Sequence, residues 1–112
     1  YTQGLGKLLI EYPENFLKLK AQHVDAVLAE PVLARRDGQS AVWHYMAGSC
    51  VLDIFMRVDG EGRQVKYYEF RNRQKAEKID TNAEQWSCMH ALIEQQRPMI
   101  EARLGQRTAA ID

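Results

Sequence analysis

Three hydrophobic runs separated by glycine-containing turns occupy the middle of the chain. They span Val42–Met46, Cys50–Met56 and Val65–Phe70, and they are rich in aromatic and β-branched residues. Such residues favour extended strands, because their side chains pack well on a pleated surface. Gly48 and Gly60 follow the first two runs, and glycine adopts the positive φ that a hairpin turn needs. The pattern predicts a three-stranded antiparallel meander.

Side chains of the central strand alternate between two faces of this sheet. The apolar set, which we expect to face the core, is Cys50, Leu52, Ile54, Met56 and Val58. The opposite set, which is only partly polar, is Val51, Asp53, Phe55 and Arg57. Two interpretations of the second face stay open: a partner binds there, or helices cover both faces.

Helical periodicity precedes the meander. Val24, Val27 and Leu28 lie at helical spacing within residues 21–29 and form one apolar stripe. Pro31 ends this helix, because the residue before a proline disfavours the α conformation. The apolar segment Val32–Ala34 fits a short fourth strand, followed by a charged turn at residues 35–38, whereas residues 1–6 are expected to be a frayed lead-in.

A long helix follows the meander. Thr81 and Glu84 have the spacing of a capping box, in which the threonine hydroxyl accepts a backbone hydrogen bond. Apolar residues at helical spacing continue beyond Pro98, which kinks or restarts the helix, to Gly105, a favourable terminating residue. The predicted fold is therefore α+β, with an N-terminal helix, the meander and a C-terminal helix packed on the sheet.

Length and charge limit the function classes. The 112 residues suit one domain, 1–112, with an ordered core at about residues 8–105. Lysine plus arginine and aspartate plus glutamate each number 15, so no net charge attracts nucleic acid, and we predict no nucleic-acid partner. No apolar run approaches the roughly 20 residues that span a bilayer. Because the sequence starts at Tyr1, membrane anchoring through an upstream signal or lipid-bearing segment is an open expectation.

The two cysteines, Cys50 and Cys88, lie on the central strand and on the last helix. Both are placed on the sides of these elements that we expect to face the core. In an oxidising compartment they suggest a disulfide, and in a reducing one they are buried thiols. A disulfide would close a loop of about 38 residues, which contributes about 3–4 kcal/mol in the chain-entropy model.

Part of the chain, from Leu19 to Phe70, resembles the SmpA/OmlA family of small lipoproteins of the outer-membrane β-barrel assembly machinery. The resemblance is carried by a helix ending in Leu28–Pro31, where alanine at Ala29 replaces the family's glycine, and by Trp43-His44-Tyr45 at the start of the meander. The segment from Gly48 with the later helical cysteine is also similar to small envelope proteins of α-proteobacteria. The long C-terminal helix departs from the family's two-helix, three-strand unit.

The resemblance implies a periplasmic or outer-membrane-associated domain, with or without a lipid anchor, that contacts another envelope protein and is not an enzyme. The related β-lactamase-inhibitor fold uses the same sheet surface to bind an enzyme. Aromatic residues on exposed strand faces are typical of such contacts. The predicted partner-binding residues are Trp43, Tyr45, Phe55 and Tyr68.

The alternative is a small-ligand-binding or enzymatic domain with its site around His44, Asp53 and Tyr67. His44 and Asp53 come from adjacent antiparallel strands, which brings their side chains within reach of each other. Such a pair is either a catalytic dyad or a structural contact, and Arg57 and Lys66 are other candidate partners of Asp53. No nucleophile is placed beside a histidine, and Cys88 and His90 point to different sides of their helix. We therefore assign no catalytic residue, no metal site and no cofactor.

Overall fold

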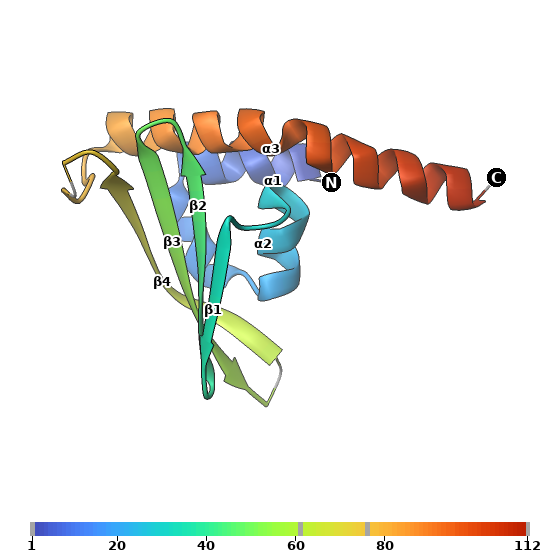
Figure 1. Ribbon diagram of the computed structural model, residues 1–112, viewed down its shortest axis with the longest axis horizontal. Coiled ribbons are helices and arrows are strands. Elements are labelled where there is room, and N and C mark those ends of the chain that lie inside the picture. The colour runs from blue at the N-terminus through green and yellow to red at the C-terminus, as the bar shows by residue number, and fades with distance from the viewer. Residues whose placement is uncertain (1, 61, 76, 112) are drawn as a thin grey trace.

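The computed structural model describes residues 2–60, 62–75 and 77–111, with the side chains of residues 2, 3, 5, 59 and 104–111 outside the description. The chain forms one antiparallel sheet with its helices packed on one face and across one end (Figure 1). This confirms the predicted α+β class. In chain order the elements are α1 Thr2–Glu11, the 3-10 helix η1 Pro13–Lys18, α2 Ala21–Leu28, β1 Leu33–Asp37, β2 Ser40–Ala47, β3 Cys50–Asp59, β4 Gly62–Asn72 and α3 Asn82–Ile111.

The sheet has four strands in the order β1-β2-β3-β4, every neighbour antiparallel. Two-residue loops close the first two hairpins, with Asp37 opposite Ser40 and Ala47 opposite Cys50. Each loop begins with a glycine at φ 60°, the conformation that a type II′ turn requires at its first position. The predicted meander and its fourth strand are both confirmed.

The core lies between the sheet and the helices. The predicted inward face of β3 is buried, from Cys50 to Met56, and Leu52 and Ile54 are fully covered. Val24, Val27 and Leu28 of α2 pack on the same core, as their helical spacing predicted. Burying such side chains stabilises the fold by about 1.5–3 kcal/mol each. The remaining large buried side chains are Leu9, Phe16, Tyr45, Val65, Phe70, Met89 and Leu92.

Differences from the predicted boundaries occur in α1, β1 and α3, and β4 also extends beyond Phe70, to Asn72. Residues 1–6 were expected to be a frayed lead-in, but α1 already begins at Thr2, and Leu9 on it is fully buried. Gly4 and Gly6 make this helix difficult to predict from the sequence, because glycine has low helix propensity. At Gly6 the small residue has a packing reason, since a Cβ there would lie 3.3 Å from Cδ1 of Ile93.

Two further differences lie in β1 and α3. The charged residues expected to form a turn at 35–38 instead extend β1 to Asp37. The helix expected to stop at Gly105 continues to Ile111, with Pro98 inside it. Its cap is confirmed in part: the Glu84 amide donates to Oγ1 of Thr81 at 3.3 Å, while the Glu84 carboxylate accepts from that hydroxyl instead of from the backbone.

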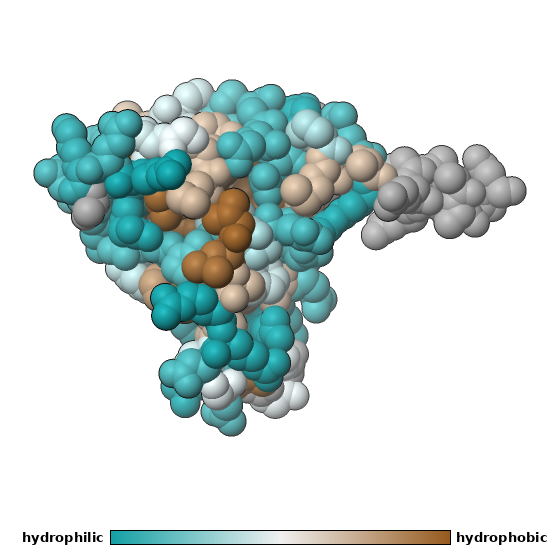
Figure 2. Space-filling model, viewed as in Figure 1, coloured by the Kyte–Doolittle hydropathy of each residue, from teal (hydrophilic) through white to brown (hydrophobic). Residues whose placement is uncertain are grey.

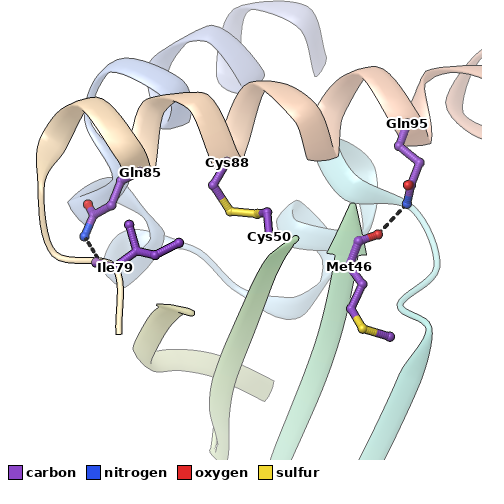
Figure 3. Close-up of a disulfide and its surroundings, with 6 residues drawn as sticks. All are labelled: Met46, Cys50, Ile79, Gln85, Cys88 and Gln95. Carbon is purple, nitrogen blue, oxygen red and sulfur yellow. Dashed lines mark hydrogen bonds between the residues drawn. A yellow bond between two sulfur atoms is a disulfide. The ribbon is translucent and has the colours of Figure 1, made fainter. Parts of the chain in front are cut away.

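A disulfide between Cys50 and Cys88 attaches α3 to the start of β3, with the two Cα atoms 5.4 Å apart (Figure 3). This confirms the predicted pairing. Side-chain amides hold α3 on both sides of it, because Gln85 donates to the Ile79 carbonyl at 3.0 Å and Gln95 donates to the Met46 carbonyl at 2.5 Å. A stable disulfide indicates an oxidising compartment.

The connection from α2 to β1 is held by α3 and β2. The buried Gln96 amide of α3 donates to the carbonyls of Leu28 and Glu30, at 2.6 and 2.9 Å. Between these two residues Ala29 is fully buried with φ 57°, a conformation that glycine adopts most easily. The Tyr45 hydroxyl donates to the Ala29 carbonyl at 3.4 Å.

Candidate functional site

No helix formed by the described residues covers one face of the sheet, and we call this face the open face. The strand register places its side chains in rows across the strands. One row is Arg35, Val42, Phe55 and Tyr67, and the next row is Leu33, His44, Asp53 and Glu69. The prediction left two possibilities, a partner surface or helices on both faces, and the structure shows helices on one face only (Figure 1).

Asp53 lies at the centre of the open face and is only 3% exposed. Its Oδ1 accepts from Nδ1 of His44 on β2, directly opposite in register. Its Oδ2 accepts from Arg71 on β4, at 2.9 Å from Nε and 2.7 Å from Nη2. A buried carboxylate is tolerated only when charged and hydrogen-bonded partners replace water, and here both oxygens are satisfied.

An aromatic pair lies beside this network. The rings of Phe55 and Tyr67 are 5.4 Å apart in a tilted arrangement, and Tyr67 is 44% exposed. Nζ of Lys78 donates to the Tyr67 hydroxyl at 3.2 Å, and this hydrogen bond raises the lysine pKa. Lys78, which is charged at neutral pH like any exposed lysine, places a cation at the β4 border of the face.

Hydrophobic surface gathers at the centre of the view that looks onto the open face, with hydrophilic surface around it (Figure 2). The apolar residues of this face are the exposed Leu33 and the half-buried Val42, Met46 and Phe55. Apolar surface with polar residues around it is typical of protein-binding surfaces. On this face the apolar side chains lie beside the buried Asp53 network.

The four predicted partner-binding residues do not form one surface. Phe55 lies on the open face, but Trp43, Tyr45 and Tyr68 have their side chains on the helix-covered face. Tyr45 is 1% exposed, and this burial raises its pKa. The Tyr68 ring contacts Phe16 of η1 in a tilted arrangement, with ring centroids 5.6 Å apart. The prediction of a common exposed surface is wrong, because aromatic content alone does not show which face the helices cover.

The alternative site around His44, Asp53 and Tyr67 is brought together only in part. His44 and Asp53 form the predicted pair, but Tyr67 belongs to the neighbouring row and contacts Phe55. Nε2 of His44, the nitrogen that would act as a base, is buried and has no hydrogen-bond partner among the described residues. A base must reach the proton that it removes, so this geometry favours a structural role for the pair.

Two grooves lie elsewhere, and neither is lined by His44 or Asp53. One runs between α1 and α3, with a volume of about 620 Å³ and Ile10, Ile93 and Ile100 among its lining residues. The other, of about 350 Å³, lies along the outer edge of β4 and includes Tyr67 and Lys78.

Sequence analysis missed Arg71, because the third predicted strand ended at Phe70. β4 continues to Asn72, so Arg71 stands opposite Val51 and reaches diagonally to Asp53. The signal that could have revealed it is strand alternation: Phe70 faces the core, so Arg71, the next residue, faces the open side if β4 continues. Arg57 and Lys66, the other candidate partners, do not pair with Asp53.

No family model, curated protein or solved structure matches this chain. Within the described residues no cluster of histidine, cysteine or acidic side chains could hold a metal ion. In the same part of the chain, no helix has the length and hydrophobicity needed to cross a membrane.

Proposed function

We propose that this chain is a non-catalytic domain of the bacterial cell envelope, periplasmic or associated with the outer membrane, that binds another envelope protein through the open sheet face. The observation that carries the proposal is the helix-free face itself. It presents Leu33, Val42, Phe55 and Tyr67 around a carboxylate that is fixed by two partners.

The energetics of this face support binding over catalysis. A rigid, hydrogen-bonded centre costs little conformational entropy when a partner covers it, because its side chains are already ordered. Phe55 and Tyr67 supply large apolar area with few rotatable bonds, as the anchors of interfaces commonly do. A reactive base, in contrast, is not presented to solvent.

The location is supported by the disulfide and by the resemblance to the outer-membrane assembly lipoproteins. The disulfide suits the periplasm, which keeps thiols oxidised. Ala29 occupies the position where that family has glycine, and its φ of 57° is a conformation that glycine would adopt without strain. The backbone conformation at Ala29 is therefore compatible with the family's glycine at this position.

Site-specific photo-crosslinking in the native cell envelope tests the proposal. A photoreactive phenylalanine is placed at Phe55 or at Tyr67, and discrete adducts with another envelope protein are expected from both positions. Tyr12, an aromatic residue of similar exposure that lies outside the open face, is the matched control and should give no such adduct. Equal adducts from Tyr12, or none from the open face, would contradict the assigned surface.

A further inference from the structure

The two edges of the sheet are treated differently by the fold. Along β4, the Val65 N–H donates to the Leu19 carbonyl at 3.0 Å, and the Ile79 N–H donates to the Phe70 carbonyl at 2.8 Å. Both ends of the β4 edge are therefore partly paired with other segments of the chain. Within the described residues, β1 pairs only with β2 and all five of its residues are exposed. A bare edge strand is a template for another strand.

The register shows which backbone groups of β1 are free. Asp37 opposes Ser40 across a two-residue loop, and the pair that closes such a loop is hydrogen-bonded. Hydrogen-bonded and non-hydrogen-bonded pairs then alternate along an antiparallel ladder. The N–H and C=O groups of Ala34 and Arg36 therefore point away from β2, toward the space that an added strand would occupy.

The side chains along this edge carry a charge preference. Arg35 and Arg36 are adjacent, exposed and on opposite faces of the sheet, and neither has a carboxylate partner among the described side chains. Leu33, 52% exposed, lies on the open-face side two residues before Arg35. An added strand would be stabilised by acidic residues opposite both arginines and by an apolar residue opposite Leu33, because directly opposed cross-strand pairs interact.

We propose that β1 binds an extended acidic segment of a protein partner as an additional antiparallel strand. In the partner's chain direction, the complementary pattern is two acidic residues, any residue, then an apolar residue, which face Arg36, Arg35, Ala34 and Leu33 in turn. The inference rests on the proposed function, since it identifies the partner's contribution at the border of the open face. Backbone pairing supplies affinity, and the side chains supply specificity.

A second copy of this chain fits the edge poorly. In an antiparallel pair of two β1 strands centred on Arg35, on Arg36 or between them, at least one arginine stands directly opposite another arginine. Like charges in direct opposition destabilise a strand pair. A pair centred on Ala34 avoids this, but it places Arg35 opposite Leu33 and gives neither arginine a carboxylate partner. Charge complementarity therefore favours an acidic partner strand over self-pairing.

The test is an amide NMR titration of the folded, disulfide-bonded protein with two short synthetic peptides. The first has alternating threonine and valine around a central Glu-Glu-Thr-Val, and the second has both glutamates replaced by lysine. The acidic peptide should shift the amides of Ala34 and Arg36 most, and the lysine peptide should bind about tenfold more weakly or not at all.

Two variants give independent controls. Ala34→Pro removes an outward-facing donor and should abolish peptide binding. The double variant Arg35→Glu, Arg36→Glu should reverse the preference, so that the lysine peptide binds and the acidic one does not. This exchange keeps the test decisive if the proline variant does not fold.

Four outcomes would overturn the inference: no shift with either peptide, equal shifts with both, shifts confined to other elements, or concentration-dependent shifts of β1 without peptide. The first would mean that the arginines only protect the edge from aggregation, and the last would identify a second copy as the occupant. None of these results removes adducts at Phe55 or Tyr67, so failure here is distinguishable from failure of the proposed function.

Discussion

Buried polar residues make the most specific demands on this fold at the scale of single side chains. Asp53 needs His44 and Arg71 in place at once, because a buried carboxylate without partners is costly. Gln96 satisfies two carbonyls around Ala29, which has a positive φ. These contacts fix the open face and the α2–β1 connection.

Replacing Asp53 by asparagine should lower the free energy of unfolding by about 3 kcal/mol, because one neutral amide cannot replace both charged hydrogen bonds. Urea unfolding at neutral pH measures the change. Asp25→Asn removes a more exposed contact with Arg103 and should cost at most about 1 kcal/mol. Equal effects of the two substitutions would show that the Asp53 network is not a stabilising feature.

Tyr45 should make the protein sensitive to alkaline pH. Burial raises its pKa in the folded state, so above the unfolded pKa of about 10 the folded state binds more protons than the unfolded state. Stability is then fully present below about pH 10 and falls above it, with a slope approaching about 1.4 kcal/mol per pH unit from this residue. Tyr45→Phe should reduce that slope in denaturant titrations, and an unchanged slope would contradict the assignment.

Ala29 provides a test of backbone conformation. A valine there should lower the free energy of unfolding by at least about 2 kcal/mol, because β-branched residues rarely adopt a positive φ and the site is fully buried. Glycine should stay within about 1 kcal/mol of the native residue, since relief of strain offsets the lost methyl group. Thermal unfolding of the two variants distinguishes these outcomes.

At the scale of elements, α3 is attached to the sheet through one covalent and several polar contacts. The disulfide joins it to β3, and Gln85 and Gln95 bind backbone carbonyls on either side (Figure 3). Met89 and Leu92 of the same helix are buried in the core, so apolar packing and these polar contacts together hold α3 on the sheet.

Removing the disulfide with Cys50→Ala and Cys88→Ala should lower the free energy of unfolding by about 4 kcal/mol, because a loop of 38 residues is no longer closed in the unfolded chain. Urea unfolding of the double variant measures the loss. Reduction of the native protein is the matched comparison and should give a similar decrease. A decrease below about 1 kcal/mol in both would show that the side-chain contacts alone hold α3.

At the scale of the whole molecule, the arrangement separates a covered face from an open one. All described helices lie on one side or across one end, so a single layer of sheet has its other side available (Figure 1). The formal net charge is zero, so we expect recognition to depend on the local pattern of charged and apolar residues.

The redox state tests the molecule as a unit. Protein made in an oxidising compartment should have no thiol that can be alkylated after denaturation, and two after reduction, because both cysteines are joined. Mass spectrometry of the alkylated protein reads this directly. Two alkylated thiols before reduction in protein taken from its native cells would remove the argument for export.

Most of the fold could be predicted because its elements are marked locally. Alternation in β3, helical spacing in α2 and the cap at Thr81 each depend on neighbouring residues. α1 was not predicted, because its two glycines lower the helix propensity of residues 2–11. Packing against α3 stabilises this helix in the folded protein.

The candidate site was predicted less well. The pair His44 and Asp53 was found because adjacent strands bring them together, but Arg71 was missed because the length of β4 was underestimated. Tyr45 was predicted to lie on the surface but is buried. The local sequence around an aromatic strand residue does not show which face of the sheet its side chain occupies.

The sequence by itself determined the α+β class, the meander and the two cysteines that could pair, since periodicity and residue type act over a few neighbours. Only the tertiary structure decided which face the helices cover, which strand edge is bare and which cation reaches Asp53. These depend on the register of distant segments, and register is set by packing that no local pattern contains.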